Sequence, residues 1–161
     1  MKKQVMAFSG PSNSGKTTLI NKLIKHFSAQ NLKVFVLKHD PSDKACFDTK
    51  GKDSFSFFEN KAEVFVLSPT RTTFFSHEPR SVEECLRLAG DFDLFLIEGL
   101  KTLPYPRIGV FKDKLDESYF SVCNAIASYE KPKNNTLTWL DLDDIKGIAS
   151  FILQNAFQFK G

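Results

Sequence analysis

Apolar residues in this chain gather into short runs that alternate with amphipathic stretches. Residues 4–9 are almost entirely apolar, which is typical of a strand buried on both faces. Residues 18–27 instead carry their large apolar side chains at helical spacing, so they predict a helix with one buried stripe. By the same patterns we expect further strands at residues 33–38, 63–68, 93–98, 106–111, 122–127 and 137–140, and a shorter edge strand at 71–75.

Helix signals fall between these strands. Asp53 is expected to cap a helix over residues 54–60, and Ser81 begins another helix with two glutamates in its first turn. Residues 141–160 are expected to form a closing helix, while residues 39–52 form a long polar loop. This alternation predicts an α/β fold of three layers, a mainly parallel sheet flanked by helices, in one domain over residues 1–161.

Composition fits a globular protein and narrows its partners. The 161 residues are 42% hydrophobic and 25% charged, and the net charge is +3. The basic residues are scattered, so we expect no nucleic-acid partner. We also expect no signal peptide and no membrane span, because no apolar run is long enough. Three widely spaced cysteines without a CxxC pattern favour free thiols in the cytoplasm.

One segment carries a complete phosphate-binding motif. Residues 10–17 match GxxxxGK[ST], the Walker A or P-loop pattern, between an expected strand and an expected helix. Such a loop points its N–H groups at phosphate oxygens, and the helix N-terminus adds its positive dipole end. We expect Lys16 to reach the β- and γ-phosphates and Thr17 to bind Mg²⁺. The expected nucleotide-binding residues are Gly10, Ser12, Asn13, Ser14, Gly15, Lys16, Thr17 and Thr18.

Two carboxylates follow expected strands at the edge where ligands bind in α/β sheets. Glu98 ends an apolar run, so we expect it to hold Mg²⁺ together with Thr17, although strands also end at solvated charges. Asp40 is a candidate for ordering water or a second metal contact, but Asp-Pro equally begins a turn. With Lys16 these two acids form the expected catalytic set. His39 could orient a phosphate or simply be a loop histidine.

Several segments outside the phosphate loop resemble one known family. The sequence reads Lys-His-Asp at 38–40, Phe-Asp-Thr-Lys-Gly-Lys-Asp-Ser at 47–54, Leu-Ile-Glu-Gly-Leu-Lys at 96–101 and Pro-Arg-Ile at 106–108. Together with the closing segments at 125–128 and 140–145, these resemble the molybdopterin-guanine dinucleotide biosynthesis adaptor family, MobB. The resemblance runs over nearly the whole chain.

The resemblance implies a GTP-binding protein with Mg²⁺ and a P-loop NTPase-like fold. It implies weak GTP hydrolysis, a homodimer with extended sheets, and a role beside MobA, the guanylyltransferase that joins GMP to molybdopterin. It also places Asp48, Gly51, Lys52, Asp53 and Ser54 in the same cleft or on a partner surface. The chain departs from the family by lacking extra histidines after residue 39, and it has no NKxD motif for guanine. Ala127 and Ser128 are the candidate base contacts.

Two other functions stay open at this point. A small-molecule kinase using ATP would normally carry an arginine-rich lid, whereas this chain has four scattered arginines. A metallochaperone NTPase would need cysteine or histidine ligands, and His39 and Cys46 lie in one loop. We expect hydrolysis to be slow, because no arginine finger is evident in the sequence.

Overall fold

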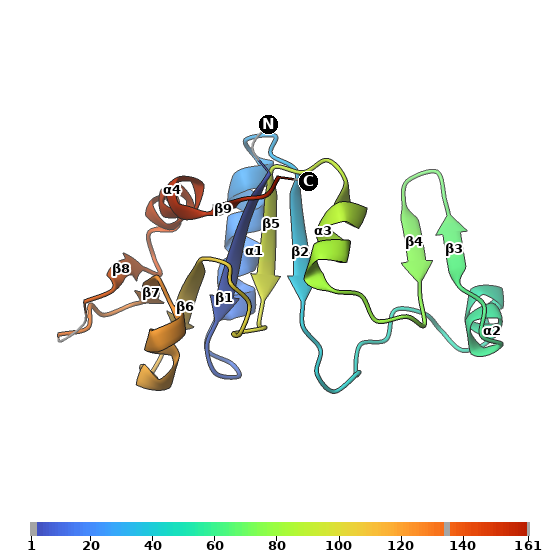
Figure 1. The fold of residues 1–161 in the computed structure, drawn as a ribbon, viewed down its shortest axis with the longest axis horizontal. Coiled ribbons are helices and arrows are strands. Elements are labelled where there is room, and N and C mark those ends of the chain that lie inside the picture. Colours follow the sequence, from blue (N-terminus) through green and yellow to red (C-terminus); the bar gives the residue numbers. More distant parts are fainter. Residues whose placement is uncertain (1–2, 134–135, 161) are drawn as a thin grey trace. The chain divides into compact units, whose positions relative to one another are not determined.

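The computed structural model describes residues 3–133 and 136–160. The chain divides into two compact units, one of residues 1–39 with 86–161 and one of residues 40–85. A single domain over residues 1–161 stays a prediction. The described part of the first unit holds a seven-stranded sheet, drawn in Figure 1. Its strands are β1 (Gln4–Ser9), β2 (Val34–Lys38), β5 (Leu94–Glu98), β6 (Arg107–Phe111), β7 (Ala125–Ser128), β8 (Thr138–Asp141) and β9 (Phe157–Gln158).

The strand order brings three strand ends to one edge of this sheet. The parallel strands follow the order β2-β5-β1-β6-β7-β8, and β9 pairs antiparallel with β1. Glu98 at the end of β5 is in register with Lys38 of β2 and with Phe8 of β1. The phosphate loop therefore begins beside Glu98, at the carboxyl ends where such sheets bind ligands. The α/β fold with a mainly parallel sheet, predicted from the sequence, is confirmed.

Helices α1 (Lys16–Ser28) and α4 (Ile145–Asn155) pack against the same core as the sheet. The expected stripe on α1 is buried, and α4 contributes three buried residues of its own. Burial of this apolar surface holds α1, and hence the phosphate loop before it, against the sheet. The buried helix residues are Leu19, Ile20, Leu23, Phe27, Ile148, Ala149 and Ile152.

The second unit holds α2 (Asp53–Glu59) and the strands β3 (Val64–Leu67) and β4 (Thr72–Phe75). β3 and β4 form their own antiparallel pair, a two-stranded sheet separate from the parallel one. The expectation that Asp53 caps a helix is wrong. Lys52 occupies the cap position without a side-chain hydrogen bond, and Asp53 is the first residue of α2, where its charge suits the helix dipole.

The other helices follow the sequence signals in part. α3 (Val82–Ala89) starts after Ser81, whose Oγ accepts from Glu84 N at 3.2 Å while Glu84 Oε2 accepts from Ser81 N at 2.7 Å. The closing helix ends at Asn155 and not at residue 160, because Ala156 turns to extended backbone and Phe157 pairs with β1. A 3₁₀ helix, η1 (Glu117–Val122), was not predicted.

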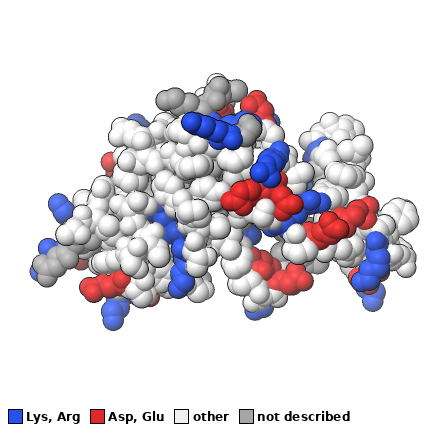
Figure 2. Space-filling view, in the orientation of Figure 1, with Lys and Arg blue, Asp and Glu red and all other residues white. Residues whose placement is uncertain are grey.

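Charge is spread over the molecule. On the face drawn in Figure 2, lysine and arginine side chains alternate with acidic ones, and no continuous basic area is visible there. This agrees with the scattered basic residues of the sequence. Among the described residues, no helix is both long enough and apolar enough to cross a membrane.

Candidate functional site

Glycines allow the backbone of the phosphate loop to take its shape. Gly10 has φ +150° and Gly15, the residue before α1, has φ +99°. A Cβ on Gly10 would lie 2.5 Å from the Val110 carbonyl oxygen and 2.6 Å from Ser14 Oγ, so a side chain does not fit there. Both positions favour glycine, because L side chains rarely adopt such φ values. The loop therefore wraps tightly against β6 before α1 begins.

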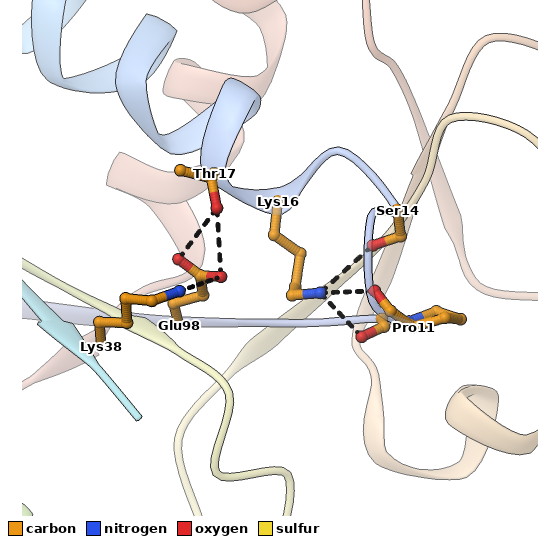
Figure 3. Close-up of polar contacts among 7 residues, drawn as sticks. Pro11, Ser14, Lys16, Thr17, Lys38 and Glu98 are labelled. Atoms are coloured by element: carbon orange, nitrogen blue, oxygen red, sulfur yellow. Dashed lines mark hydrogen bonds and ion pairs between the residues drawn. The ribbon is translucent and has the colours of Figure 1, made fainter. Parts of the chain in front are cut away.

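The Lys16 ammonium lies inside this loop. Its Nζ donates to the carbonyl oxygens of Gly10 at 2.9 Å and Pro11 at 2.7 Å, and contacts Ser14 Oγ at 3.5 Å (Figure 3). Burial lowers the pKa of Lys16, the Glu98 carboxylate raises it, and the Lys38 ammonium lowers it. The loop thus holds a partly desolvated cation, which interacts more strongly with phosphate oxygens than a fully hydrated one.

Thr17 and Glu98 come together although 81 residues separate them in the sequence. Thr17 Oγ1 lies 3.3 Å and 3.4 Å from the two carboxylate oxygens of Glu98, and Lys38 Nζ lies 3.3 Å from Oε1 (Figure 3). A hydroxyl and a carboxylate that converge at a strand end are the hard oxygen ligands that Mg²⁺ accepts. These two residues therefore fit a magnesium site, in which phosphate oxygens and water would supply the other ligands.

A cavity of about 470 Å³ opens over these residues. Besides residues 12–18 it is lined by Lys38, Glu98 and Lys112. Two further cavities, of about 490 and 550 Å³, share residues 112–115 with each other and extend over the segments that follow β6 and β7. The phosphate site therefore has space beside it for a nucleoside.

The base contact expected at Ser128 stays a prediction. Ser128 lines one of the adjoining cavities, but its side chain is already engaged within the protein. Its hydroxyl donates to the Glu130 carbonyl at 2.7 Å and accepts from Trp139 Nε1 at 3.1 Å. Ala127 is fully buried. A base bound here would contact the backbone of Ser128 and the neighbouring loop residues more than the Ser128 hydroxyl.

Asp40 belongs to the second unit and makes local hydrogen bonds. Its Oδ2 accepts from the N–H groups of Lys44 and Ala45, each at 2.7 Å, and these bonds hold the pKa of Asp40 below its usual value. The carboxylate thus closes a turn, as Asp-Pro often does. Its catalytic role stays a prediction, as do the cleft positions expected for Asp48, Gly51, Lys52, Asp53 and Ser54 in the same unit.

His39 lies beside Glu98. Among the described residues, no hydrogen bond joins the His39 ring to the Glu98 carboxylate. The His39 backbone N–H donates to the Glu98 carbonyl at 3.0 Å, continuing the β2–β5 pairing. A Cβ on Gly99, which has φ +96°, would lie 3.1 Å from His39 Cβ. The histidine therefore packs against the turn that follows Glu98.

Three residues of this region received no role from the sequence. Lys38 was expected only to end a strand, and its pairing with Glu98 follows from the β2–β5 register, which the residue pattern alone does not reveal. Lys112 follows β6, its N–H donates to the Ser14 carbonyl at 3.0 Å, and its side chain lines the cavity. Arg107 is fully buried, and its guanidinium donates to Ser9 Oγ at 2.8 Å. The sequence signal for this buried position is a single arginine at the start of an otherwise apolar strand.

Comparisons with known proteins agree on one family. A family model described as molybdopterin guanine dinucleotide synthesis protein B, MobB, matches residues 5–128. The chain is 28% identical over 161 residues to the molybdopterin-guanine dinucleotide biosynthesis adapter protein of Escherichia coli, covering 93% of this chain and 91% of that protein. It is 30% identical over 165 residues to the protein of the same name from Haemophilus influenzae, covering 98% and 92%.

Solved structures give the same answer for the fold. A crystal structure of molybdopterin-guanine biosynthesis protein B aligns with a TM-score of 0.76 at 25% identity, covering 93% of this chain and 98% of that one. The crystal structure of Bacillus subtilis MobB aligns with a TM-score of 0.76 at 23% identity, covering 98% and 99%. The chain, whose phosphate loop ends at Thr17 beside Glu98, belongs to the MobB family.

Proposed function

We propose that this chain is a GTP-binding adaptor in molybdenum cofactor biosynthesis that assists the attachment of GMP to molybdopterin. The observation that carries the proposal is the convergence of Lys16, Thr17 and Glu98 at one cavity in a chain of the MobB family. Relatives that match nearly its whole length bear the name molybdopterin-guanine dinucleotide biosynthesis adapter protein. The nucleotidyl transfer itself would belong to a MobA-like guanylyltransferase.

Each side chain of the site has a distinct task in this proposal. Loop N–H groups and Lys16 bind the phosphates, and Thr17 and Glu98 would hold Mg²⁺, which neutralises charge on the phosphates when bound. Among the described residues that line the cavity there is no arginine, and Arg107 is buried with its guanidinium on carbonyl groups. Hydrolysis is therefore expected to be slow without a partner, because the described residues that line the cavity include no arginine finger.

Neither alternative function gains support from the structure. Among the described residues that line the cavity there is no arginine, and Arg107 is buried, so these residues do not favour the arginine-rich lid of a kinase. Within residues 3–133 and 136–160, no group of three or more histidine, cysteine, aspartate or glutamate side chains could hold a metal ion. The cytoplasmic location stays a prediction.

Replacing Glu98 with glutamine should slow magnesium-dependent GTP hydrolysis by about tenfold to a hundredfold, the usual loss when the environment of a metal site is altered. The amide keeps the shape of the side chain but removes the charge that faces Thr17. GTP binding without Mg²⁺ should change little. Phosphate release over time, measured at saturating GTP, checks the expected loss.

A matched control is Asp143→Asn, which removes one exposed carboxylate outside the cavity lining. It should hydrolyse GTP at the rate of the unmodified chain. If Glu98→Gln also keeps that rate, the metal role assigned to Glu98 is wrong.

We further propose that the chain forms a homodimer through the β3–β4 hairpin. Within the described chain these strands pair only with each other, which leaves their outer edges open. The hairpin also exposes large apolar side chains, with Phe65 66% and Leu67 76% exposed. Such exposed apolar surface beside open strand edges favours pairing with a second copy.

Replacing Leu67 with lysine should shift the dimer toward the monomer, raising its dissociation constant about tenfold or more, because a charge would enter an apolar contact. Since Leu67 is largely exposed, the fold should tolerate the change. Light scattering at several protein concentrations measures the shift. Thr70→Lys, at an exposed position in the hairpin turn, is the matched control and should leave the mass unchanged. A monomeric unmodified chain would refute the homodimer.

The adaptor role requires a physical partner. We propose that a MobA-like guanylyltransferase carrying molybdopterin binds this chain. The support is the name of the relatives, molybdopterin-guanine dinucleotide biosynthesis adapter protein, since the described residues themselves do not mark the partner surface. Co-purification with a MobA-like enzyme, with and without GTP, tests it, and absence of any complex under both conditions would contradict it.

A further inference from the structure

Lys38 is an exposed cation beside a mostly buried carboxylate. It is the last residue of β2 and lies in register with Glu98, the last residue of β5. The two side chains form an ion pair at 3.3 Å, in which the lysine side chain is 65% exposed and the glutamate side chain 12%. Glu98 is therefore held by its surroundings, whereas Lys38 can leave the pair at little cost, since exposed ion pairs contribute little to stability.

Three lysines line the phosphate cavity, and they stand at different places. Lys16 lies inside the loop on the carbonyl groups of Gly10 and Pro11. Lys112 packs over Gly15: a Cβ added to Gly15 would lie 3.4 Å from the Lys112 Cβ. The Lys112 Nζ lies 3.8 Å from Asp113 Oδ2. Lys38 reaches the Thr17–Glu98 pair, and Figure 3 shows it on the far side of Glu98 from the loop.

The Thr17–Glu98 side is where the terminal phosphate of a bound triphosphate belongs. In phosphate loops of this type the lysine and the hydroxyl after it face the β- and γ-phosphates and their metal. A Glu98 carboxylate that holds Mg²⁺ would attract Lys38 less strongly, whereas the γ-phosphate oxygens would offer the Lys38 ammonium a greater negative charge. A diphosphate lacks these oxygens.

We infer that Lys38 exchanges the Glu98 carboxylate for the γ-phosphate when a triphosphate binds, and so distinguishes GTP from GDP. This inference rests on the proposed function, because it assigns a specificity role within the same nucleotide site. It gives the strand-end lysine the task of sensing whether the terminal phosphate is present. The adaptor would then differ between its triphosphate and diphosphate states at the end of β2.

The test is a calorimetric titration in excess Mg²⁺ with a non-hydrolysable GTP analogue and, separately, with GDP. The unmodified chain should bind the analogue more tightly than GDP. Lys38→Gln should weaken analogue binding about tenfold, the loss of one charge-assisted hydrogen bond, and leave GDP binding nearly unchanged. Lys38→Met should do the same, whereas Lys38→Arg, which keeps the charge, should retain the preference.

Lys25→Gln removes one exposed charge from α1 away from the cavity lining and should leave both affinities unchanged. If both neutral Lys38 variants keep the preference of the unmodified chain, or lose GDP binding equally, the role of Lys38 is wrong while GTP binding stands. Equal affinity of the unmodified chain for analogue and GDP would overturn it as well. An unmodified chain that binds neither nucleotide would instead refute the proposed function.

Discussion

Replacing Lys16 with alanine should abolish GTP binding in the range that calorimetry can measure. The ammonium lies within the phosphate loop, held by the carbonyl oxygens of Gly10 and Pro11. Its charge is partly desolvated, which is also why its pKa is lowered. In the complex, the variant would lack two charge-assisted hydrogen bonds from Lys16 to phosphate oxygens, each worth about 1.5–3 kcal/mol. Their loss should weaken GTP binding by about a thousandfold.

The control for this variant is Lys25→Ala on the same helix. Lys25 is exposed and does not line the phosphate cavity, so its replacement should leave GTP affinity unchanged. Thermal unfolding without nucleotide should show that both variants remain folded. A Lys16→Ala variant that binds GTP within about threefold of the unmodified chain, well under 1 kcal/mol, would show that the phosphates lie elsewhere.

Replacing Arg107 with methionine should lower the free energy of unfolding more than any other substitution proposed above. Only 1% of Arg107 is exposed, and its guanidinium donates to Ser9 Oγ and to the carbonyl oxygens of Gly99, Leu100 and Leu103 at 2.8–3.2 Å. No carboxylate pairs with it among the described residues. Burial lowers its pKa, but arginine remains charged at neutral pH.

Methionine fills part of the space but leaves the buried Ser9 hydroxyl and three partly buried carbonyl oxygens without this donor. The free energy of unfolding should fall by about 3–5 kcal/mol, because several acceptors lose a donor at a cost of about 1–3 kcal/mol for each one left unsatisfied. Arg87→Met, at an exposed position of α3, should change it by less than about 0.5 kcal/mol. Urea unfolding measures both. A loss below about 1 kcal/mol at Arg107 would mean that water or a local shift satisfies these groups.

The Arg107 variant also bears on the site. The guanidinium ties Ser9, directly before the phosphate loop, to the backbone that follows Glu98. Without it, the loop and the acid lose a shared support. We therefore expect the folded fraction of Arg107→Met to bind GTP more weakly than the unmodified chain.

Local sequence patterns were sufficient to predict the phosphate loop and Glu98. The apolar run before Gly10, the helical stripe after Lys16 and the acid at the end of a buried strand all follow from residues close in sequence. Parallel pairing then brings Glu98 to Thr17, as the rule for strand ends in α/β sheets predicts.

The parts that could not be predicted depend on contacts between distant residues. A strand was expected at residues 63–68, but Phe65 and Leu67 are exposed in a separate hairpin, because a short apolar run does not say which sheet it joins. The closing helix stops before the end of its apolar pattern because Phe157 pairs with β1. Lys38 gains its partner only from the strand order.

We propose that this chain binds GTP in preference to ATP. The purified chain is titrated calorimetrically with GTP and with ATP, each with Mg²⁺. Binding of GTP should be tight and binding of ATP weak. Equal binding of the two nucleotides, or a preference for ATP, would contradict it and favour the kinase alternative.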